Sequence, residues 1–204
     1  MIIDVSSNQG VIDWAKVSKD PKEINGVILR ATTRNGNLDV RTIQNYNGIL
    51  QNMNDNLNGL SFYKFSYARD YMSARIECMK TLHRLFDAGI RKDIIDMFYL
   101  DLEAWGGRDY TRDECNEVIT GYFNVCNEMN VNLGLYFNYN YAKNIVDPVW
   151  HYVLPLWIAR YNSTLGNVDP WRPILWQYTS KGHVDGINGN VDMSKRVMWS
   201  EKRR

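Results

Sequence analysis

Several features that narrow the class of a protein are missing from this chain of 204 residues. Its three cysteines, Cys78, Cys115 and Cys126, cannot all pair with one another, and none has the CxxC spacing of a metal or redox site. We therefore expect buried free thiols and no disulfide framework. No apolar run approaches the roughly 18 residues of a membrane span, and the net charge of +1 gives no general attraction for nucleic acid.

Aromatic residues, by contrast, are plentiful: the chain has seven tryptophans and thirteen tyrosines. The segment 98–105 reads FYLDLEAW and places two carboxylates two residues apart among aromatic side chains. Side chains alternate between the two faces of a β-strand, so Tyr99, Asp101, Glu103 and Trp105 are predicted to share one face. Hydrolysis of a sugar bond needs such a group, with one carboxyl protonated, one ionised, and flat apolar surfaces for the ring. An ordinary strand with solvent-exposed acids is the alternative.

Strand-like and helix-like patterns alternate along the chain. Strands are predicted at 2–5, 27–32, 60–66, 97–103, 133–138, 154–160, 174–178 and 190–193, and helices at 14–19, 42–53, 71–88, 112–129 and 139–146. This alternation is typical of parallel β/α units. We predict a single α/β domain over residues 1–204, an eight-stranded TIM-like β/α barrel with incomplete helical cover and about five helices. An open doubly wound sheet is the second choice.

Active sites of β/α barrels lie at the carboxyl ends of the strands. The late strand positions hold Asp4 on the first predicted strand, Asp101 and Glu103 on the fourth, and Asp192 on the last. The first and last strands of a closed barrel are neighbours, so Asp4 and Asp192 are expected to meet. The pattern therefore predicts an acidic cleft.

Eight short segments carry a resemblance to a known family. They are 3–10, 12–14, 27–32, 62–65, 101–103, 156–161, 176–179 and 186–192, which read IDVSSNQG, IDW, VILRAT, FYKF, DLE, LWIARY, WQYT and GINGNVD. In this order, over nearly the whole chain, they resemble family 25 of the glycoside hydrolases, the Ch-type lysozymes. The resemblance implies a flattened β/α barrel that hydrolyses the β-1,4 bonds between N-acetylmuramic acid and N-acetylglucosamine in bacterial peptidoglycan.

The resemblance also implies roles for individual residues. Glu103 matches the proton donor of the family, and Asp4, Asp101 and Asp192 match its other active-site carboxylates. Tyr63 and Phe65 fall in the family's Tyr-His-Phe segment, where this chain has Lys64 in place of His and where alternation should turn Lys64 away from the cleft. Further candidate sugar contacts, each also credible as a packing residue, are Tyr136, Trp157, Gln177 and Tyr178.

The proton donor must hold its proton near neutral pH, so its pKa must be raised. We expect an ionised Asp101 and burial beside Trp105 to raise the pKa of Glu103. Three routes stay open at this stage: direct attack by a carboxylate, attack by an activated water, and attack by the substrate's own 2-acetamido group with Asp101 orienting the amide. No metal-ligand spacing is present, so neither a metal nor a cofactor is expected.

Two other functions compete with a muramidase: a catalytically silent carbohydrate-binding barrel, and another hexosaminidase such as a chitinase. The expected partner is the glycan strand of peptidoglycan, with neither nucleic acid nor membrane, and the oligomeric state is left open. The strand-like N-terminus leaves no room for a signal peptide. We therefore expect a phage-type lysin made in the host cytoplasm and released to the wall through a holin, with a wall-binding module following residue 204.

Overall fold

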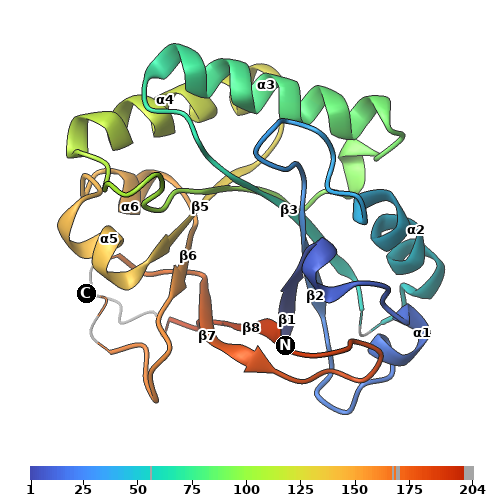
Figure 1. Ribbon diagram of the computed structural model, residues 1–204. Helices are drawn as coiled ribbons and strands as arrows, with labels where there is room; N and C mark the ends of the chain where they lie inside the picture. Colours follow the sequence, from blue (N-terminus) through green and yellow to red (C-terminus); the bar gives the residue numbers. More distant parts are fainter. Residues whose placement is uncertain (56, 167, 169–170, 200–204) are drawn as a thin grey trace.

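The computed structural model describes residues 1–55, 57–166, 168 and 171–199, and its strands close into a barrel in sequence order (Figure 1). The strands are β1 (Ile2–Val5), β2 (Gly26–Arg30), β3 (Gly59–Phe65), β4 (Met97–Asp101), β5 (Leu133–Asn138), β6 (Leu156–Ala159), β7 (Leu175–Gly182) and β8 (Val191–Arg196). The predicted eight-stranded α/β barrel is therefore confirmed. The basic tail at 201–204 lies outside the described residues.

Strands β1 to β7 run parallel, whereas β8 runs antiparallel to both β7 and β1. The reversal has a consequence for the site, because the first residues of β8 lie at the end of the barrel where the parallel strands finish. Asp192, the second residue of β8, is the register partner of Asp4 on β1. The two acids meet as predicted, although Asp192 stands early on its strand and not late.

The helices are α1 (Trp14–Val17), α2 (Thr42–Asn52), α3 (Tyr71–Asp87), α4 (Arg112–Glu128), α5 (Tyr139–Asn144) and α6 (Trp150–Val153), with 3-10 turns at Ser7–Gln9 and Lys92–Ile94. The five expected helices are present; the four-residue α6 is too short to leave a periodic pattern and was missed. Figure 1 shows the described helices around the β2 to β6 side, leaving β7 and β8 uncovered. The helical cover is thus incomplete, as predicted.

Local sequence signals explain where the helices start and stop. Thr111 caps α4 by accepting from the Glu114 N–H, and the Glu114 carboxylate accepts from the Thr111 N–H. A cap of this type contributes about 1 kcal/mol. Gly89 follows α3 with a φ of 86°, a left-handed conformation that ends the helix and favours glycine. Gly186 also has a positive φ, and a Cβ there would come within 2.4 Å of the Asp13 carbonyl oxygen.

The fourth strand ends earlier than predicted. β4 stops at Asp101, and the chain then turns through Gly106 and Gly107, both with positive φ, while Trp105 bridges to Arg108. Two-residue alternation ends where the strand ends, so it places Tyr99 and Asp101 on one face and does not extend to Glu103 and Trp105.

Apolar side chains form two clusters. One lies between the outer face of the barrel and the helices, and the other fills the barrel interior, with Ile2, Ile28, Tyr99, Tyr136 and Trp157 among its members.

All three cysteines are buried free thiols, as predicted, and the Cys78 and Cys126 sulfurs lie 3.7 Å apart between α3 and α4. In the described part of the chain, no helix is long and apolar enough to cross a membrane.

Candidate active site

Four carboxyl groups gather at the end of the barrel where the parallel strands finish. Asp4 comes from β1, Asp101 is the last residue of β4, Glu103 lies two residues beyond it, and Asp192 comes from the reversed β8. Asp4 and Asp101 interact electrostatically with one another, as do Glu103 and Asp192. The structure thus brings together all four acids singled out from the sequence.

Asp101 and Glu103 form a carboxyl pair. Burial, and next the charge of Glu103, raises the pKa of Asp101 well above its usual range. Burial also raises the pKa of Glu103, while hydrogen bonds from Asp101 and Tyr136 act in the opposite direction. The raised pKa of Glu103 and the contribution of burial to it were expected. The contribution of Asp101 was not, because Asp101 donates a hydrogen bond to Glu103, which lowers the pKa of Glu103.

Trp105 lies on the loop that follows the early end of β4. Its indole N–H donates to the Tyr110 hydroxyl at 2.9 Å, and its ring meets the ring of Tyr67 edge-on at a centroid distance of 5.5 Å. Its position beside Glu103 stays a prediction.

Asp4 and Asp192 form a second carboxyl pair. Burial and the neighbouring Asp192 raise the pKa of Asp4 well above its usual range, and burial raises the pKa of Asp192. Gln177 on β7 donates from Nε2 to Asp4 Oδ2 at 2.9 Å. Two pairs of carboxyls with raised pKa values therefore share one end of the barrel.

Gln177 connects the acids to two tyrosines. The hydroxyls of Tyr136 and Tyr161 donate to its Oε1 at 2.9 Å and 2.8 Å. Tyr161 was not among the predicted site residues, although it closes one of the resembling segments. It is 55% exposed and its hydroxyl reaches the network, so it stands at the opening of the cleft.

Two predicted sugar contacts, Trp157 and Tyr178, pack away from the cleft. Trp157 is 2% exposed, donates to the Ser194 hydroxyl, and packs between Tyr99 and Tyr136 inside the barrel. Gln177, also 2% exposed, lies among the cleft groups, but its amide is occupied by Asp4 and the tyrosines, so it positions these groups. Tyr178 packs outside the barrel against Trp176 and Met193, because it alternates with the inward-facing Gln177.

Tyr63 and Phe65 do line a hollow beside Asp101. It has a volume of about 180 Å³, and Tyr67 and Arg34 also contribute to its wall. The Arg34 guanidinium lies 5.4 Å from the ring centre of Tyr67 and 5.2 Å from that of Trp105. Neither Arg34 nor Tyr67 was predicted, since nothing in the spacing of a loop arginine indicates which rings it will contact.

Lys64 points away from the cleft, as alternation predicted. The side chain is buried between β3 and α3, where Nζ lies 3.7 Å from Glu77 Oε1 and donates to the Thr33 carbonyl oxygen at 3.1 Å. Glu77 also accepts from the Ser66 and Tyr122 hydroxyls. Lys64, which stands where the family has histidine, thus has its polar partners outside the barrel and not in the cleft.

Among the described residues, no group of three or more His, Cys, Asp or Glu is arranged to hold a metal ion. The chemistry available at the site is that of its carboxyls: proton delivery by one and charge stabilisation by the others. A closed β/α barrel with such a cluster at the carboxyl ends of its strands defines the class of barrel glycoside hydrolases.

Comparison with known proteins narrows this class to one family. The model of glycosyl hydrolases family 25 matches residues 3–187, and the chain belongs to that family. A curated relative is the autolytic lysozyme of Clostridium acetobutylicum, 26% identical over 193 residues, which are 95% of this chain and 54% of the relative. The chain therefore spans about half the length of that relative.

Solved structures agree on the fold. The modular autolysin LytC of Streptococcus pneumoniae, in complex with a synthetic peptidoglycan ligand, superposes with a TM-score of 0.81 at 23% identity, covering 95% of this chain and 45% of LytC. The bacterial lysozyme of Streptomyces coelicolor superposes with a TM-score of 0.75 at 18% identity, and the match covers 97% of this chain and 92% of that lysozyme.

Proposed function

We propose that this glycoside hydrolase is a muramidase that cleaves the β-1,4 bond between N-acetylmuramic acid and N-acetylglucosamine in bacterial peptidoglycan. The observation that carries the proposal is the pair of the buried Asp101 and the half-buried Glu103, two carboxyls with raised pKa values at the end of the barrel where the parallel strands finish. Family membership and the lysozyme name of the clostridial relative support the choice of substrate.

Glu103 is the proposed proton donor. We infer that Asp101 and Glu103 share a proton in the free enzyme, with Asp101 as the hydrogen-bond donor, because the hydrogen bond between them raises the pKa of Asp101 and lowers that of Glu103. Substrate that hydrogen-bonds to Asp101 favours its ionised form, so the proton moves to Glu103 and from there to the glycosidic oxygen. Asp4 and Asp192 add negative charge where the sugar becomes positive.

Asp101 also has a free acceptor. Its Oδ1 is buried and has no hydrogen-bond partner in the described part of the chain. A buried acceptor without a donor is costly, and the 2-acetamido N–H of a bound sugar supplies one. This favours the substrate-assisted route among the three open ones, with the acetamido oxygen attacking the anomeric carbon while Asp101 orients the amide.

The test is digestion of purified Gram-positive walls, followed by borohydride reduction and mass spectrometry of the fragments. Reduced muramic acid at the new ends supports the proposal; reduced glucosamine, or a preference for chitin oligomers, replaces it with another hexosaminidase. Folded protein that binds walls without releasing fragments is a silent carbohydrate-binding barrel. An anomeric product of retained configuration supports the substrate-assisted route, and an inverted product excludes it.

Release from a host cytoplasm through a holin and a wall-binding module after residue 204 stay predictions, as do the roles given to the individual site residues.

A further inference from the structure

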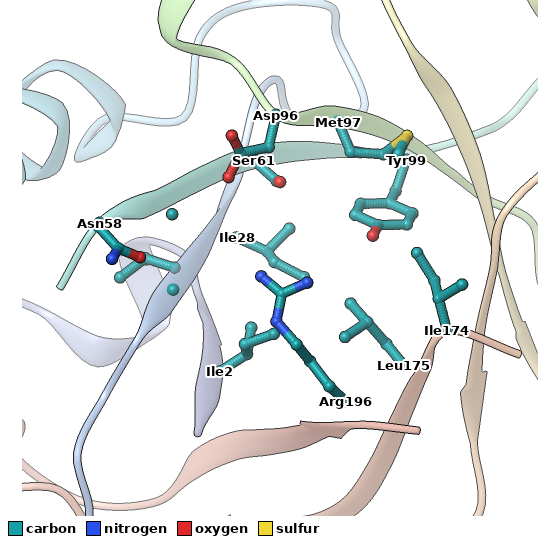
Figure 2. A pocket seen from close by; sticks show the side chains of 13 residues that line it. Ile2, Ile28, Asn58, Ser61, Asp96, Met97, Tyr99, Ile174, Leu175 and Arg196 are labelled. Carbon is teal, nitrogen blue, oxygen red and sulfur yellow. The ribbon is translucent and has the colours of Figure 1, made fainter. Parts of the chain in front are cut away.

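The opposite end of the barrel holds a cavity of about 370 Å³ (Figure 2). It lies at the amino-terminal ends of β1 to β4 and β7, where the reversed β8 finishes. None of the four carboxyl groups of the cleft lines it.

Two glycines create much of this space. Gly26 and Gly59 are register partners at the starts of β2 and β3, two residues before Ile28 and Ser61 on the same faces. Neither has a positive φ, so the backbone does not demand glycine there. A Cβ at Gly26 would meet nothing closer than 3.4 Å, whereas a Cβ at Gly59 would lie 3.2 Å from Asp96 Oδ2 and 3.3 Å from the Asn25 carbonyl oxygen. Inward positions of a barrel are normally filled by branched side chains, and here they are empty.

Polar side chains also line this space. Tyr99 is 3% exposed and Ser61 is 8% exposed, and both contribute to the wall of the cavity. Figure 2 shows the Tyr99 hydroxyl and the Arg196 guanidinium directed into the cavity. Arg196 has no carboxylate within 4.0 Å in the described part of the chain. Arg196 is exposed at the mouth of the cavity, so one cation and two hydroxyls converge on the same space.

The walls between the donors are apolar. Ile2, Ile28 and Leu175 surround the guanidinium, and the Asp96 carboxylate stands at the far side, held by the Leu60 N–H at 3.1 Å. A guanidinium with two hydroxyls suits a planar carboxylate, which accepts two parallel hydrogen bonds from arginine. The Asp96 carboxylate would repel the additional negative charge of a phosphate. The cavity therefore favours a ligand with a single negative charge.

We propose that this cavity is a second ligand site, which binds a small monocarboxylate with a short, branched apolar body. The carboxylate accepts from Arg196, Tyr99 and Ser61, and the apolar body occupies the space that Gly26 and Gly59 leave open. A hollow of this size with few convergent polar groups on apolar walls is typical of small-molecule sites. The inference is independent of the proposed muramidase activity, because the site shares no carboxyl with the cleft.

The experiment measures binding of 4-methylpentanoate to the whole chain by ligand-observed NMR and calorimetry, with 4-methylpentan-1-ol and inorganic phosphate as comparison probes. Saturable binding of the carboxylate at one site, at least about tenfold tighter than either comparison probe, supports the proposal. No saturable binding, or equal binding of the alcohol, overturns it.

Variants locate the site. Arg196→Met removes the cation and keeps an apolar side chain, and Gly26→Val fills the space; each should weaken binding at least about tenfold. Lys195→Met is the matched control, because Lys195 lies on the outer face of β8 over Trp176, and it should bind as the parent does. Wall lysis by the variants reports that they fold. Binding that survives both Arg196→Met and Gly26→Val contradicts this location.

Discussion

The two ends of the barrel differ in what their inward side chains do. Along β1 the inward position changes from Ile2 at one end to Asp4 at the other, and along β4 it changes from Tyr99 to Asp101. The apolar layer and the acidic layer of inward side chains are therefore only two residues apart along each of these strands. The acidic end gathers four carboxyls, two buried and two half-buried, and the opposite, glycine end leaves space where Gly26 and Gly59 carry no side chains.

This difference indicates that the acidic end lowers the free energy of unfolding. A buried acid with a raised pKa is destabilising at a pH at which it ionises, and a cluster of four persists where chemistry needs it. The glycine end contains none of these four acids, so its side chains can be substituted without contacting them. We therefore predict that substitutions at the acidic end change activity, and that substitutions at the glycine end change ligand binding.

The largest effect is expected at the acidic end. Glu103→Gln keeps the shape of the side chain and cannot protonate the leaving oxygen, so kcat on purified walls should fall by about 10²–10⁴-fold. Wall binding and the melting temperature should change little. The exposed Glu23→Gln is a matched control that should retain activity. Activity of Glu103→Gln within a few-fold of the parent would remove Glu103 from the donor role.

A second substitution separates catalysis from stability. Asp101→Asn should lower kcat more than it raises KM, because Asp101 acts as charge develops on the sugar. The same change should raise the melting temperature at pH 7. The folded-state pKa of Asp101 is raised, so its contribution to stability is full below the unfolded pKa and is lost as pH rises through the folded pKa.

Asparagine does not ionise, so the gain in melting temperature from Asp101→Asn should become smaller as the pH falls toward 4. Each 1 kcal/mol corresponds to about 2–4 °C in a chain of this size, which calorimetry resolves. A variant that is less stable than the parent at pH 7 contradicts the idea of a charge conflict at this end.

The pH profile gives a third, smaller effect. The alkaline limb of kcat/KM should report loss of the proton that Asp101 and Glu103 hold. The negative charge of Asp192 raises the pKa of Glu103, so Asp192→Asn should move this limb to lower pH. Asp87→Asn, an exposed change at the end of α3, should leave the limb in place. A shift to higher pH would mean that Asp192 does not act on Glu103 through its charge.

Much of this architecture could be predicted because it depends on local patterns. Strand and helix periodicity, the Thr111 cap and Gly89 define the elements, and closure of the barrel follows from the number of strands. Asp4 and Asp101 could be located since each stands late on a parallel strand. The reversal of β8 leaves no mark on its short sequence, although Asp192 reaches the right end because of it.

The failures have a common physical origin. Trp157, Gln177 and Tyr178 were weighed by residue type, and type does not say whether a ring lies inside the barrel, in the cleft or on the outside. Tyr161 and Arg34 stand on loops, whose course depends on tertiary contacts and not on periodicity. Alternation was reliable at Lys64, where the strand continues, and does not apply to Trp105, which lies beyond the end of β4.

The smallest expected effect compares two arginines. Arg34 at the acidic end and Arg196 at the glycine end both lack a carboxylate partner within 4.0 Å among the described residues. Arg34 is exposed and packs on Tyr67 and Trp105 beside the hollow that Asp101 lines. Peptidoglycan differs from chitin in the lactyl ether and peptide of its muramic acid, which carry carboxylates. Arg34 is therefore placed to attract this substrate as it enters the cleft.

Arg34→Ala should raise KM for peptide-bearing walls by about fivefold, the size of one exposed charge contact of ~1 kcal/mol, with kcat unchanged. On glycan strands stripped of peptide and with their lactyl carboxyls amidated, the variant should equal the parent, and added salt should narrow the difference on walls. Arg196→Met should leave both substrates unaffected, because it lies at the other end of the barrel. An equal KM increase on stripped and intact strands would show that Arg34 only supports the aromatic wall. An effect of Arg196→Met on lysis would show that the two ends do not act independently.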